Sequence, residues 1–253
     1  MHAASETYRD GSTAFEGFLA YDGAASRRRP AVLVFHQWSG CSSFEVEKAE
    51  WLAGLGYAAL AVDMYGAGKR GTNPAENGAL MTPLVEDRAL LRRRAEAALA
   101  HVRSLPMVDP GRIGAIGFCF GGLCALDLAR AGIDGVRGCA SLHGLLGAPG
   151  GIARAERMRT KVLALHGWND PMARPDAVLA FAREMHDHGA DWQLHAFGGC
   201  GHAFTNPQAQ DAKAGMQHNP LADARSFAMV RDFLAEVFGD SWSTPVTCCP
   251  WPS

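Results

Sequence analysis

The chain has 253 residues, of which 48% are hydrophobic and 20% are charged, and its formal net charge is -2. A chain of this length can bury most of the surface that its unfolded form exposes, so its core needs neither disulfides nor a metal. The near balance of acidic and basic residues excludes the strongly basic surface typical of proteins that bind nucleic acid or anionic membranes. We expect one domain over residues 1–240, because α/β folds often run to about 250 residues as a single domain.

The compartment is indicated by the N-terminus and by the cysteines. The opening MHAASETYRDG is polar and lacks the apolar core of a secretory signal, and no run approaches the ~18 apolar residues of a membrane span. The cysteine count of 7 is odd, which favours free thiols in a reducing compartment. We therefore expect a cytoplasmic protein. Cys248 and Cys249 lie in a Pro-rich stretch, which we interpret as a C-terminal extension over 241–253, with a metal or redox role as the alternative.

Apolar runs of strand length alternate with longer helical patterns. An alternating run over 15–21 predicts an antiparallel edge strand. Near-continuous apolar runs, typical of a parallel sheet covered on both faces, predict strands at 31–35, 57–62, 113–116, 136–142, 161–165 and 192–196. Helical spacing predicts helices at 44–55, 84–104, 120–131, 175–188 and 221–238. The alternation predicts an α/β fold with a mostly parallel central sheet, helices on both faces and an active site at the carboxyl ends of the strands.

Two stretches fit neither pattern. Residues 66–83 and 144–159 are rich in Gly, Asn or Pro and follow predicted strands, so we expect irregular loops there. Long loops at the carboxyl ends of strands commonly contact substrate or form lids. We expect both stretches to border the site.

The strand predicted at 113–116 runs into Gly117-Phe118-Cys119-Phe120-Gly121-Gly122 and then into a predicted helix. Gly-x-Cys-x-Gly-Gly between a strand and a helix is the nucleophile elbow with cysteine in place of serine. At its tip, Cys119 would lie beside a helix N-terminus, whose dipole favours the thiolate. A buried structural cysteine and a dinucleotide-binding loop are alternatives, but the glycines do not have the G-x-G-x-x-G spacing and no Gly-Lys-Ser/Thr follows.

An elbow enzyme carries its acid and then its histidine further along the chain. Asp170 follows the strand at 161–165, although turn formation is an alternative role for an Asp before Pro. His202 follows the strand at 192–196 in a glycine-rich loop. We predict Cys119 as nucleophile, His202 as base and Asp170 as the acid that orients it. A metal pair of Cys200 and His202 would lack further ligands, so no metal is expected.

An acyl-transfer site also needs N–H donors for the developing oxyanion. We predict the backbone N–H of Phe120 and a second one from the loop after the first core strand, at Gln37 or Trp38. The other histidines are weaker candidates. Three of them fall at strand ends and could line the pocket without doing chemistry, namely His36, His143 and His166. His195 lies inside a predicted strand and is interpreted as structural.

Together these motifs resemble the dienelactone hydrolase (carboxymethylenebutenolidase) family of the α/β-hydrolase superfamily, over about residues 14–238. The resemblance rests on Phe35-His36-Gln37-Trp38-Ser39-Gly40, Val62-Asp63-Met64-Tyr65-Gly66, Gly117-Phe118-Cys119-Phe120-Gly121-Gly122, His166-Gly167-Trp168-Asn169-Asp170 and Gly201-His202-Ala203-Phe204. It implies an α/β-hydrolase fold, a triad of Cys119, Asp170 and His202, and no cofactor.

Two positions depart from the family pattern. Members that open dienelactones resemble one another in having a glutamate, thought to help form the thiolate, where this chain has Gln37. They also have an arginine that grips the substrate carboxylate shortly after the histidine, where this chain has Thr205 and Asn206. Thiol activation would then rest on His202 and the helix dipole, and an anionic lactone would lack its charged fork. Arg88 and Lys69 are candidates to replace that cation.

We predict a hydrolase of small carboxylic esters or lactones, with a neutral or modestly polar substrate favoured over dienelactone itself. The alternative is a non-hydrolytic thiol protein that uses Cys119 for redox sensing or ligand capture, with Cys124 nearby in sequence. Peptidase action is a third possibility, for which the amine is the poorer leaving group. We expect a monomer or small homo-oligomer with no nucleic-acid or membrane partner.

Overall fold

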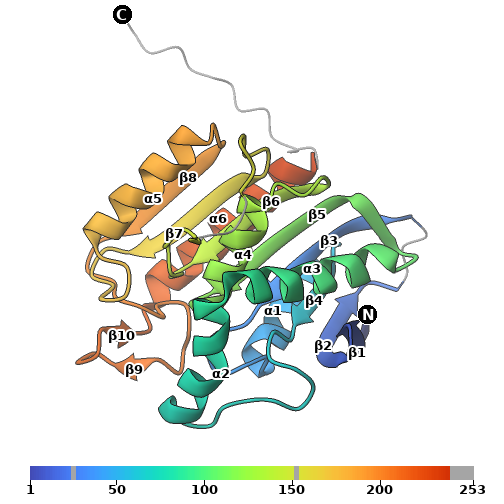
Figure 1. Cartoon of the computed structure of the whole chain (residues 1–253), viewed down its shortest axis with the longest axis horizontal. Coiled ribbons are helices and arrows are strands. Elements are labelled where there is room, and N and C mark those ends of the chain that lie inside the picture. Colours follow the sequence, from blue (N-terminus) through green and yellow to red (C-terminus); the bar gives the residue numbers. More distant parts are fainter. Residues whose placement is uncertain (24–26, 151–153, 240–253) are drawn as a thin grey trace, which may run out of the picture.

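An eight-stranded sheet forms the centre of the molecule (Figure 1). A computed structural model describes residues 1–23, 27–150 and 154–239. The strands are β1 (His2–Asp10), β2 (Thr13–Tyr21), β3 (Arg29–Phe35), β4 (Ala58–Val62), β5 (Val108–Phe118), β6 (Val136–Leu142), β7 (Lys161–Gly167) and β8 (Trp192–Phe197), in the order β1-β2-β4-β3-β5-β6-β7-β8. The strands from β3 to β8 are parallel, and β2 is antiparallel to both of its neighbours. The predicted mostly parallel sheet is confirmed.

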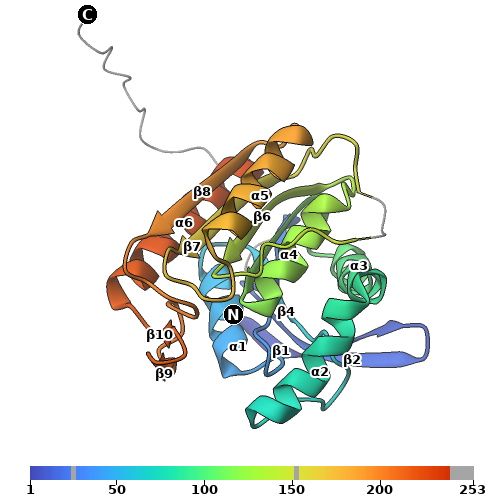
Figure 2. The same ribbon diagram turned by 60° about the vertical axis from the view of Figure 1, so that its left-hand side comes forward.

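Helices cover both faces of the sheet, as Figures 1 and 2 show. They are α1 (Ser43–Gly54), α2 (Pro74–Glu86), α3 (Arg88–Ser104), α4 (Phe120–Arg130), α5 (Pro175–Asp187) and α6 (Pro220–Phe238). Alternate side chains of β3 enter different cores: Leu33 belongs to the core that includes residues of α3, α4 and α5, whereas Val32 belongs to the core that includes residues of α1 and α6. Both cores are continuous and apolar, so the sheet is buried on its two faces.

The prediction that residues 15–21 form a strand at the edge of the sheet is wrong, because β2 lies between β1 and β4. Residues Thr13–Tyr21 do form an antiparallel strand, but β1 pairs along its whole length, from His2 opposite Tyr21 to Asp10 opposite Thr13. Only Tyr8 of β1 is buried, so this strand carries no apolar alternation from which it could be predicted.

The loop predicted over 66–83 is irregular only as far as Asn73. The Asn73 side chain accepts a hydrogen bond from the N–H of Glu76, at 3.0 Å, and α2 begins at Pro74. Asp87 ends α2 and caps α3 by accepting from the N–H of Leu90, at 2.9 Å. The single helix predicted over 84–104 is therefore two helices. Since α2 buries only two of its residues, its apolar pattern is weak.

The other predicted helices agree with the structure to within one residue at either end. The described residues of the 144–159 stretch are irregular, as predicted. A short hairpin of β9 (Gln210–Asp211) and β10 (Met216–Gln217) lies between β8 and α6 in sequence. Among the helices of the described ranges, none has the length and apolar character needed to cross a membrane. The expected extension over 241–253, with Cys248 and Cys249, lies outside the described residues.

Candidate active site

The predicted elbow is a sharp turn at the carboxyl end of β5. Cys119 alone separates β5 from α4, and its backbone is in a rare conformation, with φ 55° and ψ -116°. A Cβ on Gly117 would lie 2.0 Å from the carbonyl oxygen of Gly121, and a Cβ on Gly121 would lie 2.1 Å from that of Phe35. Both positions therefore require glycine. The turn leaves Cys119 9% exposed.

Asp170 follows β7 and His202 follows β8, and their side chains meet beyond the carboxyl ends of these two strands. The Nδ1 of His202 lies 2.7 Å from Oδ2 of Asp170, and both residues are buried, at 1% and 2% exposed. The other carboxylate oxygen accepts from the N–H of Met172, at 2.8 Å. With Nδ1–H donating to the carboxylate, Nε2 of the imidazole is buried and has no hydrogen-bond partner among the described residues, and His202 lines the same cavity as Cys119.

Two glycines allow the backbones that carry these residues to touch. A Cβ on Gly167 would lie 2.2 Å from the carbonyl oxygen of Gly201, and one on Gly201 would lie 2.2 Å from that of Gly215. The N–H of His202 donates to the carbonyl of Gly215, at 2.7 Å, and its carbonyl accepts from the N–H of Gln217, at 3.1 Å. The loop of Asp170, the loop of His202 and the β9–β10 hairpin are thus packed backbone to backbone.

Backbone strain is concentrated at the same place. Within the described ranges, three residues other than glycine have positive φ: Cys119 (55°), His143 (40°) and Ala203 (57°). The N–H of Cys119 donates to Leu142, at 3.1 Å, and that of His143 donates to Leu165, at 2.8 Å. The surrounding strands therefore hold these conformations in place. Strained backbone of this kind is typical of functional sites.

The charge state of His202 depends on Cys119. Burial disfavours the charged imidazole, but the negative charge of Cys119 as a thiolate and the hydrogen bond to Asp170 outweigh burial and raise the pKa of His202 to about 10. At neutral pH the imidazole is therefore protonated as long as its neighbour is a thiolate. An imidazolium beside a cysteine sulfur favours the thiolate over the thiol.

The histidines at the strand ends do not line the cavity, so that expectation is wrong. His36 donates from Nδ1 to the carbonyl of Gln37, at 2.5 Å, and accepts from the N–H of Met64, at 3.1 Å. His143 pairs with Thr205, at 2.8 Å. Burial lowers the pKa of His36, of His143 and of His166, which keeps these rings neutral. These three histidines therefore have a structural role beside the site.

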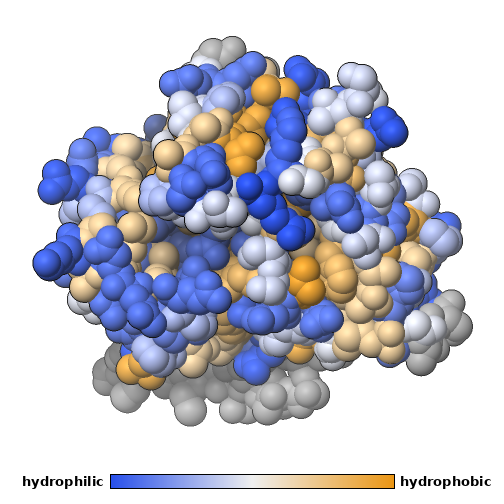
Figure 3. All heavy atoms as spheres, turned by 90° about the horizontal axis from the view of Figure 1, so that it is seen from below, coloured by the Kyte–Doolittle hydropathy of each residue, from blue (hydrophilic) through white to orange (hydrophobic). Residues whose placement is uncertain are grey.

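The catalytic cavity, as we term the one that contains Cys119, has a volume of about 310 Å³. Its lining combines apolar side chains with carboxamides: Gln37, Trp38, Met81, Cys119, Leu145, Met172, His202, Ala203, Asn206, Gln208, Ala209, Gln210, Asp211 and Met216. Met81 comes from α2 and Leu145 from the loop after β6, so each of the stretches 66–83 and 144–159 contributes a residue to this cavity. Figure 3 shows the face that carries α2 and the hairpin, with hydrophobic residues among hydrophilic ones.

Gln37 and Trp38, in the loop after β3, are the two candidates for the second N–H donor to the oxyanion, and the structure excludes one of them. The N–H of Gln37 donates to the buried carboxylate of Glu45, at 3.1 Å, so it is not available to an oxyanion. Ser42 also donates to Glu45, from its N–H at 2.9 Å and from its hydroxyl at 2.7 Å. Trp38 is the remaining choice in this loop, and its carbonyl is fixed by the hydroxyl of Tyr65, at 2.8 Å. Ser42 and Glu45 form the capping box of α1, but that pattern does not predict the bond of Glu45 to Gln37.

The two residues that depart from the family pattern are hydrogen-bonded to each other. The side-chain Nδ2 of Asn206 donates to Oε1 of Gln37, at 3.2 Å. Neither candidate replacement for the missing cation lines the catalytic cavity. Arg88 is paired with Asp127, with Nε 2.6 Å from a carboxylate oxygen, and Lys69 lines a different cavity beside Asp63.

Sequence reasoning missed the wall of the cavity beyond the motifs. Met172 follows Asp170 by two residues, and Met216 lies on the hairpin that pairs with His202. Their proximity to motif residues along the chain is the only sequence signal for them. Within the described ranges, no group of three or more His, Cys, Asp or Glu side chains could hold a metal ion.

Comparison with known proteins gives the family. The family model described as "Dienelactone hydrolase family" matches residues 15–238. The chain is 26% identical over 213 residues to a carboxymethylenebutenolidase of Pseudomonas sp. (strain P51), covering 82% of this chain and 86% of that protein. A solved structure named m3DLH is 39% identical, with a TM-score of 0.88, covering 94% and 98% of the two chains.

A second solved structure, a dienelactone hydrolase-like promiscuous phosphotriesterase, P91, from metagenomic libraries, is 35% identical with a TM-score of 0.88, covering 94% of this chain and 99% of that one. The family model spans the elbow and both loops described above. The chain therefore belongs to the dienelactone hydrolase family and is a hydrolase of carboxylic esters or lactones.

Proposed function

We propose that this hydrolase works by covalent catalysis, with Cys119 as nucleophile, His202 as general base and acid, and Asp170 as the residue that orients the imidazole. One observation carries the proposal: a buried imidazole, bonded to a carboxylate at 2.7 Å, shares a cavity with a cysteine at the tip of a strained turn. Nucleophile, base and orienting acid in this relation are the parts that acyl transfer needs.

In the first step, the thiolate of Cys119 attacks the carbonyl carbon and forms a C–S bond. The carbonyl oxygen becomes an oxyanion, which would accept hydrogen bonds from the N–H groups of Phe120 and Trp38. Phe120 is the first residue of α4, so its N–H has no acceptor within the helix. When the tetrahedral intermediate collapses, the C–O bond breaks and the imidazolium of His202 gives its proton to the leaving alkoxide.

The second step follows from the origin of the raised pKa of His202. In the thioester the sulfur of Cys119 carries no charge, so the largest influence that favours the imidazolium is absent. The pKa of His202 then falls, and the neutral ring takes a proton from water as the water attacks the thioester. The C–S bond breaks, the product leaves as a carboxylic acid that gives its proton to solvent, and the thiolate–imidazolium pair forms again.

The substrate that we propose is neutral. Among the described residues that line the catalytic cavity there is no Lys or Arg, and Asp211 stands at its rim. Apart from the imidazolium of His202, which is paired with Asp170, an anionic lactone would therefore meet no opposite charge in the cavity. Trp38, Met81, Leu145, Met172 and Met216 provide the apolar contacts for the body of the substrate. The mechanism requires neither metal nor cofactor.

The redox alternative is disfavoured by the position of Cys124. This residue is fully buried, and burial raises the pKa of its thiol well above the ordinary value, so it is poorly suited to resolve an oxidised Cys119. The cysteines at 41, 119, 124, 139 and 200 are free thiols. Their burial as thiols supports a reducing compartment, which we propose to be the cytoplasm.

Hydrolysis of p-nitrophenyl butyrate tests the proposal. Cys119→Ala should reduce turnover by a factor of at least about 10³, and iodoacetamide should inactivate the wild type by modifying one thiol. Cys139→Ala is the matched control, because it removes a fully buried thiol outside the cavity. Full turnover by Cys119→Ala would show that another residue is the nucleophile. Peroxide sensitivity without any esterase activity would favour the redox alternative.

A further inference from the structure

A second cavity adjoins the catalytic cavity and shares its wall. Its volume is about 310 Å³, and it lies over the start of α1 and the loop after His202. We term it the serine cavity, and it is lined by Gln37, Ser39, Ser42, Ser43, Phe44, Glu47, Asn206, Pro207 and Gln208. Gln37, Asn206 and Gln208 line both cavities, so the hydrogen bond between Gln37 and Asn206 stands between them.

The two cavities differ in chemistry. The catalytic cavity is rich in methionine and other apolar side chains, whereas the serine cavity has three hydroxyls, three carboxamides and one carboxylate. No Lys or Arg is among its described lining residues. Hydroxyls and carboxamides both donate and accept hydrogen bonds, so they suit an uncharged ligand that is itself rich in hydroxyl groups. The carboxylate of Glu47 disfavours an anion.

Part of this polar lining is available to a ligand. The Ser42 hydroxyl is engaged with Glu45 and with the N–H of Phe44, as the cap of α1. The hydroxyls of Ser39 and Ser43 make no hydrogen bond to another described residue. The Gln37–Asn206 bond uses one acceptor and one donor, which leaves each carboxamide with further capacity.

Resting on the proposed function, we infer that the serine cavity is the subsite for the alcohol portion of the ester, and that it takes a polyol such as a glycerol or sugar moiety. The position of the lining residues along the chain shows on which side of the substrate carbonyl this subsite lies. Asn206 and Gln208 lie on the loop that begins at His202, the residue that gives its proton to the leaving alkoxide. The leaving oxygen therefore faces this loop, with the acyl chain in the methionine-lined cavity.

Three esters of matched acyl length test the inference. We expect kcat/KM for glycerol monobutyrate to exceed that for ethyl butyrate by about tenfold or more, because each additional hydrogen bond contributes roughly two- to tenfold. The double variant Ser39→Ala/Ser43→Ala should lower that ratio by about tenfold, mainly through KM. Ser104→Ala removes a hydroxyl from the distant end of α3 and is the matched control. Ethyl 3-hydroxybutyrate places the hydroxyl on the acyl side instead.

Each outcome is informative. A ratio near one in the wild type, with ethyl butyrate still turned over through Cys119, would overturn the subsite and leave the proposed function intact. Loss of the ratio in the double variant but not in Ser104→Ala supports the subsite. A preference for the hydroxybutyrate ester that depends on Ser39 and Ser43 would overturn the assignment to the alcohol side. Turnover of none of the three esters would count against the proposed function itself.

Discussion

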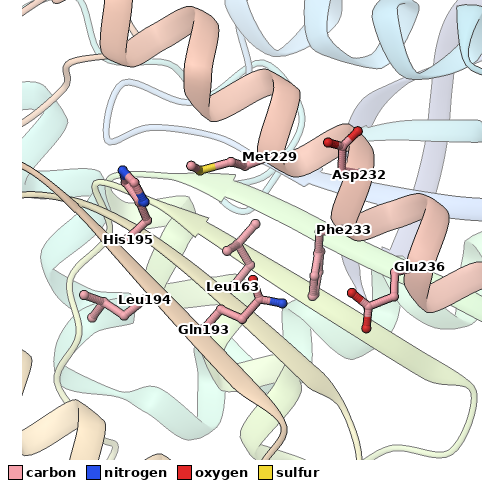
Figure 4. A pocket seen from close by; sticks show the side chains of 8 residues that line it. All are labelled: Leu163, Gln193, Leu194, His195, Met229, Asp232, Phe233 and Glu236. Atoms are coloured by element: carbon pink, nitrogen blue, oxygen red, sulfur yellow. The ribbon is translucent and has the colours of Figure 1, made fainter. Parts of the chain in front are cut away.

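The catalytic cavity and the groove between β8 and α6 are similar in volume, about 310 and 270 Å³, and opposite in organisation. In Figure 4, His195 of β8 and Asp232, Phe233 and Glu236 of α6 extend from separate elements along the groove. Glu236 is half-exposed and pairs with Lys161, at 2.6 Å. The ionisable groups of the groove therefore lie on separate elements and do not converge on one point.

In the catalytic cavity, by contrast, the ionisable groups are buried and converge. Asp170, His202 and Cys119 come from three strand ends and are held by turns that only glycine permits. Volume alone does not distinguish a functional cavity from a surface groove. Burial of titratable groups on strained backbone does, because both features cost stability and persist where function requires them.

The largest expected difference concerns the carboxylates of the two regions. Asp170→Asn should lower kcat for ester hydrolysis by about 10³- to 10⁴-fold, because an amide at this place stabilises neither the imidazolium nor its correct tautomer. Asp232→Asn in the groove makes the same chemical change and should alter kcat by less than about twofold. Steady-state kinetics on a neutral ester measure both. Comparable losses in the two variants would mean that the cavity is not where catalysis occurs.

The dependence of His202 on the thiolate can be measured directly. The raised pKa keeps the imidazole protonated as pH rises from its ordinary pKa of about 6.5 to about 10. Cys119→Ala removes the thiolate charge, so in this variant His202 should lose its proton at a pH several units lower. An NMR titration of the ring resonances would show the change, with His195 of the groove as internal control. An unchanged pKa for His202 would rule out the shared proton.

A Gly→Ala substitution should have opposite effects on the free energy of unfolding at the strained elbow and inside an ordinary helix. Gly121→Ala should lower the free energy of unfolding by about 3 kcal/mol, since the new Cβ would meet the Phe35 carbonyl at 2.1 Å. Gly78→Ala lies inside α2 with nothing within 4 Å of the Cβ, and should raise it by about 0.5–1 kcal/mol. Urea unfolding measures both. A tolerated alanine at 121 would show that the elbow is looser than its contacts imply.

The fold could be predicted wherever a strand is buried on both faces, because apolar runs such as Ala31–Phe35 report burial directly. The strand β1 and the helix α2 could not be predicted, because β1 buries only one of its residues and α2 only two. The candidate triad could be predicted because an elbow has a local signature and its partners follow in fixed order. Glu45, which takes the N–H of Gln37, could not, since its role depends on a loop and a helix start meeting in space.

The smallest expected effect concerns the preference of the catalytic cavity for neutral over anionic esters. Asn206→Arg places a cation beside Gln37, and kcat/KM for monoethyl succinate should rise about tenfold relative to ethyl butyrate, because the acyl chains match in length and only one bears a carboxylate. Gln193→Arg adds the same charge to the groove beside α6 and should leave the ratio unchanged. If both variants raise the ratio equally, the field of the whole molecule, and not a contact at Asn206, governs the choice between charged and neutral esters.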